Sequence, residues 1–137
     1  MRNLTALTIA LTIALTATAA LLAGTALDAR PRMSGAQELD KLLAGRVAGK
    51  PVHCISNFDT REMRVIDKTA IVFGWGNTLW VNVPRNPADI DDDDILITHS
   101  SGSQFCDLDI VRTADRSGGF ANGFLSLGKF VPYRRAK

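Results

Sequence analysis

The chain has 137 residues, of which 46% are hydrophobic, and its 16 Lys and Arg residues nearly balance its 14 Asp and Glu residues. A chain of this length favours a single domain. The formal net charge of +2 gives no electrostatic reason to expect a nucleic acid or a membrane surface as a partner. We therefore expect one small domain that binds no nucleic acid.

The first 26 residues have the composition of a secretory signal peptide. Arg2 supplies a short basic start, and an uncharged run rich in Ala, Leu and Thr follows it. Small residues at the end of this run predict cleavage after Ala26, with cleavage after Ala29 as the second choice. Residues 27–33 would then form a short leader before a single β-rich domain, residues 34–137. The mature protein is expected in the periplasm or outside the cell.

Two other interpretations of the first segment are weighed against this one. The segment is nearly long enough to cross a bilayer as an uncleaved anchor, and only in that case do we expect an association with a membrane. The letters "LLAGT" resemble a bacterial lipoprotein processing site, but Thr25 stands where the lipid-bearing cysteine would be. A lipoprotein is therefore not expected.

The two cysteines, Cys54 and Cys106, both lie in the part predicted to be exported. An oxidising compartment favours a disulfide between them. Because the bridge would close a long loop, the chain-entropy model gives it about 4 kcal/mol of stabilisation. The alternative is a catalytic or metal-bound thiol, which lacks a C-x-x-C motif and has only the adjacent His53 as a neighbouring ligand type.

The first element of the predicted domain is a helix over "SGAQELDKLLAGRVAG". Ser34 is a candidate N-cap, and Gln37 three residues later is its capping-box partner. Gly49 ends the helical pattern. The apolar side chains that recur at helical spacing are Leu39, Leu42, Leu43 and Val47.

After this helix the pattern changes to short strands, separated by turn residues every eight to twelve positions. "AIVFGW" and "TLWVNV" flank Gly76–Asn77, which predicts a type II′ hairpin with Phe73 opposite Trp80. "QFCDLDIVRT" is expected as one strand, with Cys106, Leu108 and Ile110 on one face. The other expected strands are "VHCISN", "MRVID", "ILITH", "FANGFLSLG" and "KFVPY".

The predicted class is mainly β (α+β), with a short N-terminal helix followed by an antiparallel meander of about six or seven strands. Such a meander would form a curled sheet, a small barrel or a sandwich. The pattern has no alternation of strands and helices, so a doubly wound nucleotide-binding fold is not expected.

The acidic run "ADIDDDDI" is the first candidate site. Asp89, Asp91 and Asp93 have the spacing that opens a calcium-binding loop. The remainder of the motif is missing, because Asp94 stands where the loop needs Gly and Ser100 where it needs Glu. The alternative is a solvated turn whose charges deter edge-to-edge pairing of the next strand.

The histidines and a second group of acids are weaker candidates for catalysis. His99 follows a strand beside "SSGS", but a His–Ser pair also needs a third group and an oxyanion hole. Asp107 and Asp109 are paired carboxylates of the kind that serve glycoside hydrolysis, and with Arg112 they are equally consistent with an ion-paired surface. We assign no catalytic residue and expect no cofactor.

Trp75 and Trp80 form, with Phe73, the aromatic cluster of the sequence. These rings are typical either of a hydrophobic core or of a face on which a carbohydrate stacks. Trp75 and Trp80 are therefore retained as weak candidates for ligand binding.

The chain resembles a group of small exported proteins of Gram-negative bacteria that share a domain of unknown function. The strings that carry this resemblance are "CIS", "RVID", "TAIVF", "LWVNVP", "SQFCDLDIVR" and "LGKFVPY". The resemblance covers about residues 45–135. It implies an exported protein with a cysteine pair that matches Cys54 and Cys106, and it implies no catalytic residue.

Two functions follow as expectations. The first is a non-catalytic binding or structural module of the cell envelope, whose partner is another envelope protein or a glycan. The alternative is a small envelope hydrolase that uses His99 or the Asp107 and Asp109 pair. The hydrolase would need a cleft that joins these side chains.

Overall fold

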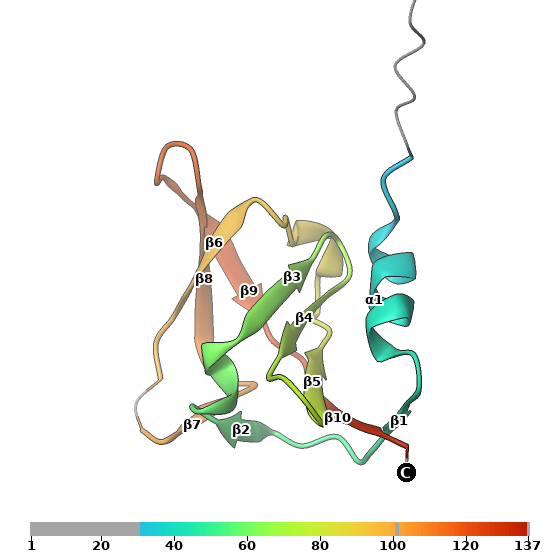
Figure 1. Cartoon of the computed structure of the whole chain (residues 1–137). Coiled ribbons are helices and arrows are strands. Elements are labelled where there is room, and N and C mark those ends of the chain that lie inside the picture. Colours follow the sequence, from blue (N-terminus) through green and yellow to red (C-terminus); the bar gives the residue numbers. More distant parts are fainter. Residues whose placement is uncertain (1–30, 101, 137) are drawn as a thin grey trace, which may run out of the picture. The chain divides into compact units, whose positions relative to one another are not determined.

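A computed structural model describes residues 31–100 and 102–136, and residues 33–137 form one compact unit (Figure 1). The predicted signal peptide and both cleavage points lie outside the described residues. The unit contains one α-helix, α1 (Gly35–Leu43), and two short 3-10 helices, η1 (Asp59–Arg61) and η2 (Pro87–Asp89). Its strands are β1 (Arg46–Ala48), β2 (Cys54–Ser56), β3 (Met63–Ile66), β4 (Ala70–Phe73), β5 (Thr78–Asn82), β6 (Asp94–Thr98), β7 (Gln104–Cys106), β8 (Ile110–Asp115), β9 (Ala121–Ser126) and β10 (Phe130–Arg135).

The helix α1 begins with the capping box expected from the sequence. The Ser34 hydroxyl accepts the Gln37 backbone N–H at 3.3 Å, and the Gln37 side-chain oxygen accepts the Ser34 N–H at 3.0 Å. The helix ends earlier than expected, at Leu43, because Gly45 adopts a φ of +72° that turns the chain. Val47 is therefore part of β1, and the prediction that it continues the helical stripe is wrong.

The strands form three antiparallel sheets. The five-stranded sheet has the order β1-β10-β5-β4-β3, the three-stranded sheet has the order β6-β8-β9, and β2 pairs with β7. The mainly β, antiparallel class is confirmed, and within residues 31–100 and 102–136 no sheet is closed into a barrel. The described residues form ten strands, so the prediction of about six or seven is wrong. The simple meander order is also wrong, because β1 and β10 come from opposite ends of the domain and pair with each other.

The hairpin between β4 and β5 has the predicted register, with Phe73 opposite Trp80 and Val72 opposite Val81. Gly76 has a φ of +70°, whereas Asn77 does not lie in the left-handed region. A positive φ at the first central residue alone is the requirement of a type II′ turn.

The five-stranded sheet buries apolar side chains on both of its faces. On one face, Leu39, Leu42 and Leu43 of α1 pack against a buried cluster (Figure 1). That cluster is Ile66, Ala70, Val72, Leu79 and Val81. The other face contributes to the main core, in which the rings of Phe73, Phe105 and Phe130 meet edge to face with centroids 5.7–5.8 Å apart. Both faces of this sheet are therefore covered by the chain itself.

The segment "QFCDLDIVRT" is two strands, and the prediction of one continuous strand is wrong. The Asp109 carboxylate accepts the Cys106 backbone N–H at 2.7 Å, and the Asp109 N–H donates to the Cys106 carbonyl. This local hydrogen bonding of an aspartate competes with strand pairing and produces a turn. Phe105 before the turn and Val111 after it both face the core, whereas Leu108 and Ile110 are exposed.

Candidate binding surface

The disulfide joins β2 and β7, two paired strands of three residues each. Cys54 on β2 and Cys106 on β7 are directly opposite each other, with Cα atoms 4.0 Å apart. Both cysteines of the chain are in this bridge, so the alternative of a catalytic or metal-bound thiol is not supported. The bridge is consistent with an oxidising compartment.

A histidine–aspartate pair flanks the disulfide. His53 precedes Cys54 and Asp107 follows Cys106, and the His53 Nδ1 lies 2.8 Å from an Asp107 carboxylate oxygen. The Asp107 backbone N–H also donates to the His53 carbonyl at 2.8 Å. This pair was not among the predicted site residues, although a bridge between Cys54 and Cys106 in antiparallel strands places the sequence neighbours His53 and Asp107 opposite each other.

A cleft of about 640 Å³ lies beside this pair and includes Asp107 in its wall. Its polar rim has three carboxylates, from Asp89, Asp107 and Asp109, and one guanidinium, from Arg85. The remaining wall combines the polar residues Asn86 and Ser126 with apolar side chains, of which Leu108 and Phe124 are 85% and 69% exposed. The residues of the cleft come from the loop around η2, the turn before β8, β8 itself and β9, as follows: Arg85, Asn86, Asp89, Asp107, Leu108, Asp109, Ile110, Phe124, Leu125 and Ser126.

The cleft continues onto the outer surface of the three-stranded sheet, which we call the apolar face. In the register of this sheet Ile97, Arg112 and Phe124 are neighbours across β6, β8 and β9. The Arg112 guanidinium lies over the Phe124 ring, 5.7 Å from its centroid. The exposed apolar residues of this face are Ile95, Ile97, Ile110 and Phe124.

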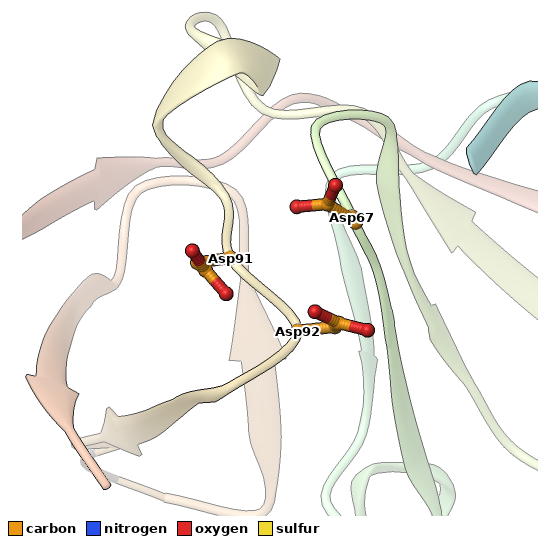
Figure 2. A group of neighbouring side chains, drawn as sticks. All are labelled: Asp67, Asp91 and Asp92. Carbon is orange, nitrogen blue, oxygen red and sulfur yellow. The ribbon is translucent and has the colours of Figure 1, made fainter. Parts of the chain in front are cut away.

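The acidic run forms a different cluster from the one predicted. Figure 2 shows Asp91 and Asp92, on the segment that enters β6, beside Asp67 on the turn between β3 and β4. Each offers a carboxylate oxygen, and these oxygens lie within 4.8 Å of one another. Carboxylate oxygens are the ligands that a calcium or magnesium ion prefers. The Lys68 ammonium already lies 3.4 Å from a carboxylate oxygen of Asp67 and supplies part of the compensating charge.

The predicted calcium ligands Asp89, Asp91 and Asp93 do not form one site. Asp89 lines the cleft, whereas Asp91 belongs to the cluster with Asp67. The Asp93 backbone N–H donates to the Asp91 carboxylate at 2.9 Å, which makes a local turn in place of a calcium loop. The described contacts therefore do not bring these three carboxylates together, and calcium binding by the D-x-D-x-D run stays a prediction.

The hydrolase candidates are also separated. His99 is an exposed residue after β6 and is not among the residues that line the cleft with Asp107 and Asp109. The Asp109 carboxylate is used in the turn that ends β7. Among the residues that the structure describes, the cleft lined by Asp107 and Asp109 therefore does not join them to His99.

The predicted aromatic cluster is divided between the core and the surface. Phe73 is buried, and Trp80 is half-buried against the main core. Trp75 is exposed and contacts Phe58, which was not among the predicted site residues, with the two rings tilted by 53° and their centroids 5.1 Å apart. Trp75 and Trp80 therefore do not form one ligand-binding surface.

The turn between β8 and β9 contains the carboxylate of Asp115. It accepts hydrogen bonds from the Ser117 hydroxyl, from the Gly118 backbone N–H at 2.6 Å and from the Ser117 N–H. These bonds, with that of the Ser117 hydroxyl the largest cause, lower the pKa of Asp115 below its ordinary value of 3.8.

In the part of the chain that the structure describes, no helix has the length and hydrophobicity required to cross a bilayer. The chain matches no family model, no curated protein and no solved structure. The resemblance to small exported proteins thus remains a prediction from the motifs.

Proposed function

We propose that the protein is an exported, non-catalytic binding module of the cell envelope, and that it binds a segment of another envelope protein at the cleft and the apolar face. The observation that carries this proposal is the exposure of Leu108, Ile110 and Phe124 along one cleft. Large apolar side chains grouped in this way are typical of interaction sites.

Burial of these side chains would provide the main part of the binding energy. Covering one Leu, Ile or Phe side chain contributes roughly 1.5–3 kcal/mol relative to leaving it in water. A part of that sum offsets the entropy lost on association. Because that loss is of similar size to the gain from three side chains, the polar groups of the cleft would have to contribute to the affinity as well.

The charges of the cleft indicate the chemistry of the partner. Its rim has three carboxylates against the single guanidinium of Arg85. A partner segment that combines apolar side chains with a Lys or Arg would complement both features. The disulfide supports this arrangement, because the turn that presents Leu108 begins directly after Cys106.

Site-specific photo-crosslinking in an exporting bacterial host tests the proposal. A photoreactive phenylalanine analogue replaces Phe124 in one protein, and it replaces Val47, an exposed residue of β1, in a matched control. We expect a discrete protein adduct from position 124 and none from position 47. The partner is then identified by mass spectrometry and purified.

Binding of the purified partner supplies the quantitative test. Phe124→Ala is expected to weaken binding by about tenfold, which corresponds to loss of one apolar anchor. Val47→Ala should leave the affinity unchanged. Equal affinity of the Phe124→Ala and wild-type proteins, or an adduct that contains only a second copy of this chain, would contradict the proposal.

A small envelope hydrolase is the second candidate, and the His53–Asp107 contact of 2.8 Å favours it. A carboxylate that orients an imidazole is part of catalytic triads, and His53 would then take a proton from a water molecule. The measurement is hydrolysis of a p-nitrophenyl ester by the wild-type and His53→Ala proteins. Equal rates for the two proteins would exclude this role of His53.

A further inference from the structure

A groove lies between the edges of the two larger sheets and shares no lining residue with the cleft. β3 is the last strand of the five-stranded sheet and β6 is the first strand of the three-stranded sheet, so within the described residues each has a neighbouring strand on one side only. The groove, which we call the edge groove, has a volume of about 280 Å³. Its walls include Met63 and Val65 of β3 and Asp94, Ile95 and Leu96 of β6.

The backbone of β6 directs the N–H and C=O groups of Leu96 away from β8. In an antiparallel pair, alternate residues direct both groups toward the neighbouring strand. Asp115 of β8 directs both groups toward β9, since its N–H donates to the Phe120 carbonyl at 2.9 Å and its carbonyl accepts the Gly119 N–H at 2.8 Å. Its partner in register, Asp94, is therefore not hydrogen-bonded to β8. Two residues later, Leu96 has its N–H and C=O on the outer edge in the same way.

The outer edge of β3 follows from its pairing with β4. The Glu62 carbonyl accepts the Gly74 N–H at 2.9 Å, and Met63 is opposite Phe73 in the register. Because the hydrogen-bonded residues alternate, Met63 and Val65 direct their N–H and C=O groups away from β4. The edge groove is therefore bordered on both sides by backbone donors and acceptors, which are a template for an added strand.

The apolar walls of the edge groove lead into the main core. Val65 and Leu96 are half-buried, and both pack against the buried residues of that core. The two edges are joined at one end, where the Lys68 N–H donates to the carbonyl of the buried residue Ile90 at 3.0 Å. Apolar side chains of an added strand would therefore pack on Val65 and Leu96 and extend the main core.

The charges of the edge groove are mainly negative. Its wall has two carboxylates, from Asp92 and Asp94, and one guanidinium, from Arg116. Asp67 and Asp91 continue this acidic surface, because their carboxylate oxygens lie within 4.8 Å of an oxygen of Asp92 (Figure 2). The ammonium beside Asp67 offsets one of these charges, and the carboxylates remain in excess. A Lys or Arg side chain at this end of the groove would complement them.

We propose that the edge groove binds an extended peptide segment, which pairs with the outer edge of β6 and carries a Lys or Arg beside Asp92 and Asp94. Alternate apolar side chains of this segment would lie on the main core. A strand that already belongs to a sheet would bring its neighbouring strand into the same small groove, so the occupant is an unpaired segment and not a second folded copy of this chain. The edge groove is separate from the cleft, so this inference does not rest on the proposed function.

Amide hydrogen exchange, measured by NMR, tests the proposal at single residues. The probe is the pentapeptide Lys-Val-Thr-Val-Lys, capped at both ends and added to the exported, oxidised protein. At saturating peptide we expect the Leu96 amide, which faces the groove edge, to exchange about tenfold more slowly. The Ile97 amide already faces β8, and its exchange should stay unchanged. The dependence of the Leu96 effect on peptide concentration should give a millimolar or tighter affinity.

Two controls assign the effect to the groove and to its charge. Met63→Ala should weaken binding of the lysine peptide about fivefold, because it removes one apolar wall of the groove. Met33→Ala is the matched variant, since Met33 is an exposed methionine outside the edge groove, and it should bind as the wild-type protein does. The peptide Glu-Val-Thr-Val-Glu should bind more weakly than the lysine peptide. Circular dichroism of both variants verifies folding.

Three outcomes would overturn the proposal. The first is unchanged exchange of the Leu96 amide in the lysine peptide, and the second is an equal loss of affinity in Met63→Ala and Met33→Ala. The third is slower exchange at Leu96 that grows with protein concentration in the absence of peptide, which would identify a second copy of this chain as the occupant. None of these outcomes affects the crosslinking test at Phe124, so failure of this proposal and failure of the cleft proposal are distinguishable.

Discussion

The five-stranded and three-stranded sheets differ in what covers their second face. Both contribute one face to the main core, where Phe73 of the first meets Val111 and Leu125 of the second in one cluster. On its other face the five-stranded sheet is covered by α1, whereas the three-stranded sheet exposes Ile95, Ile97 and Phe124. Strands that carry apolar residues on both faces therefore produce a second core in one sheet and a candidate binding surface in the other.

The two regions also differ in what stabilises them. The covered sheet has five strands and a helix that packs on it. The strands that precede the cleft, β2 and β7, have three residues each and form a two-stranded pair, which is marginal without further support. The disulfide and local aspartate hydrogen bonds supply that support near the cleft. Three predictions test this contrast.

The largest effect is expected from removal of the disulfide. The double variant Cys54→Ala and Cys106→Ala should lose about 4 kcal/mol of free energy of unfolding, because the bridge spans a separation of 52 residues. Urea denaturation measures the loss, and the wild-type protein in reductant should approach the same value. If the double variant and the oxidised wild-type protein have equal stability, the cleft side of the domain does not depend on the bridge.

The next prediction compares the two faces directly. Leu79→Ala, beneath α1, should cost about 2–4 kcal/mol of stability because it leaves a cavity in the covered cluster. Phe124→Ala, on the apolar face, should change the stability by less than about 0.5 kcal/mol.

Thermal and urea denaturation of the two variants provide the measurement for this comparison. A loss in Phe124→Ala as large as that in Leu79→Ala would show that the apolar face stabilises the isolated domain and is not reserved for a partner.

The contrast also explains which features could be predicted from the sequence. The capping box at Ser34 and the Phe73–Trp80 register depend on residues close in the chain, and the Cys54–Cys106 bridge depends on a chemistry that only two residues share. These three features could be predicted because the sequence offers few other caps, registers or cysteine pairings at these positions.

The remaining features depend on which distant segments meet. The pairing of β1 with β10 and the contact between Phe58 and Trp75 have no local signal in the sequence. The turn at Asp109 was missed for a different reason, since its side chain replaces a strand hydrogen bond within an otherwise alternating pattern. The acidic cluster could not be predicted for both reasons. Asp67 is distant in the sequence from Asp91 and Asp92, and the Asp91 carboxylate accepts a local backbone hydrogen bond from Asp93.

The smallest predicted effect concerns the tip of the uncovered sheet, where Asp115 accepts three hydrogen bonds. The pKa of Asp115 is lowered in the folded state, so its ionised form stabilises the β8–β9 turn above the ordinary value of 3.8. That contribution is lost as the pH falls below this value and through the lower pKa of the folded state. Asp115→Asn should therefore be less stable than the wild-type protein at neutral pH, and the difference should diminish at acidic pH.

An NMR titration of the Asp115 carboxyl gives a more direct measurement. Ser117→Ala removes the largest cause of the shift and should raise the pKa of Asp115 toward its ordinary value. The same substitution should accelerate amide hydrogen exchange in the β8–β9 turn and leave exchange in β4 and β5, under the helix, unchanged. An unchanged pKa in Ser117→Ala, or acceleration in both sheets, would show that the side-chain hydrogen bonds do not stabilise the uncovered sheet locally.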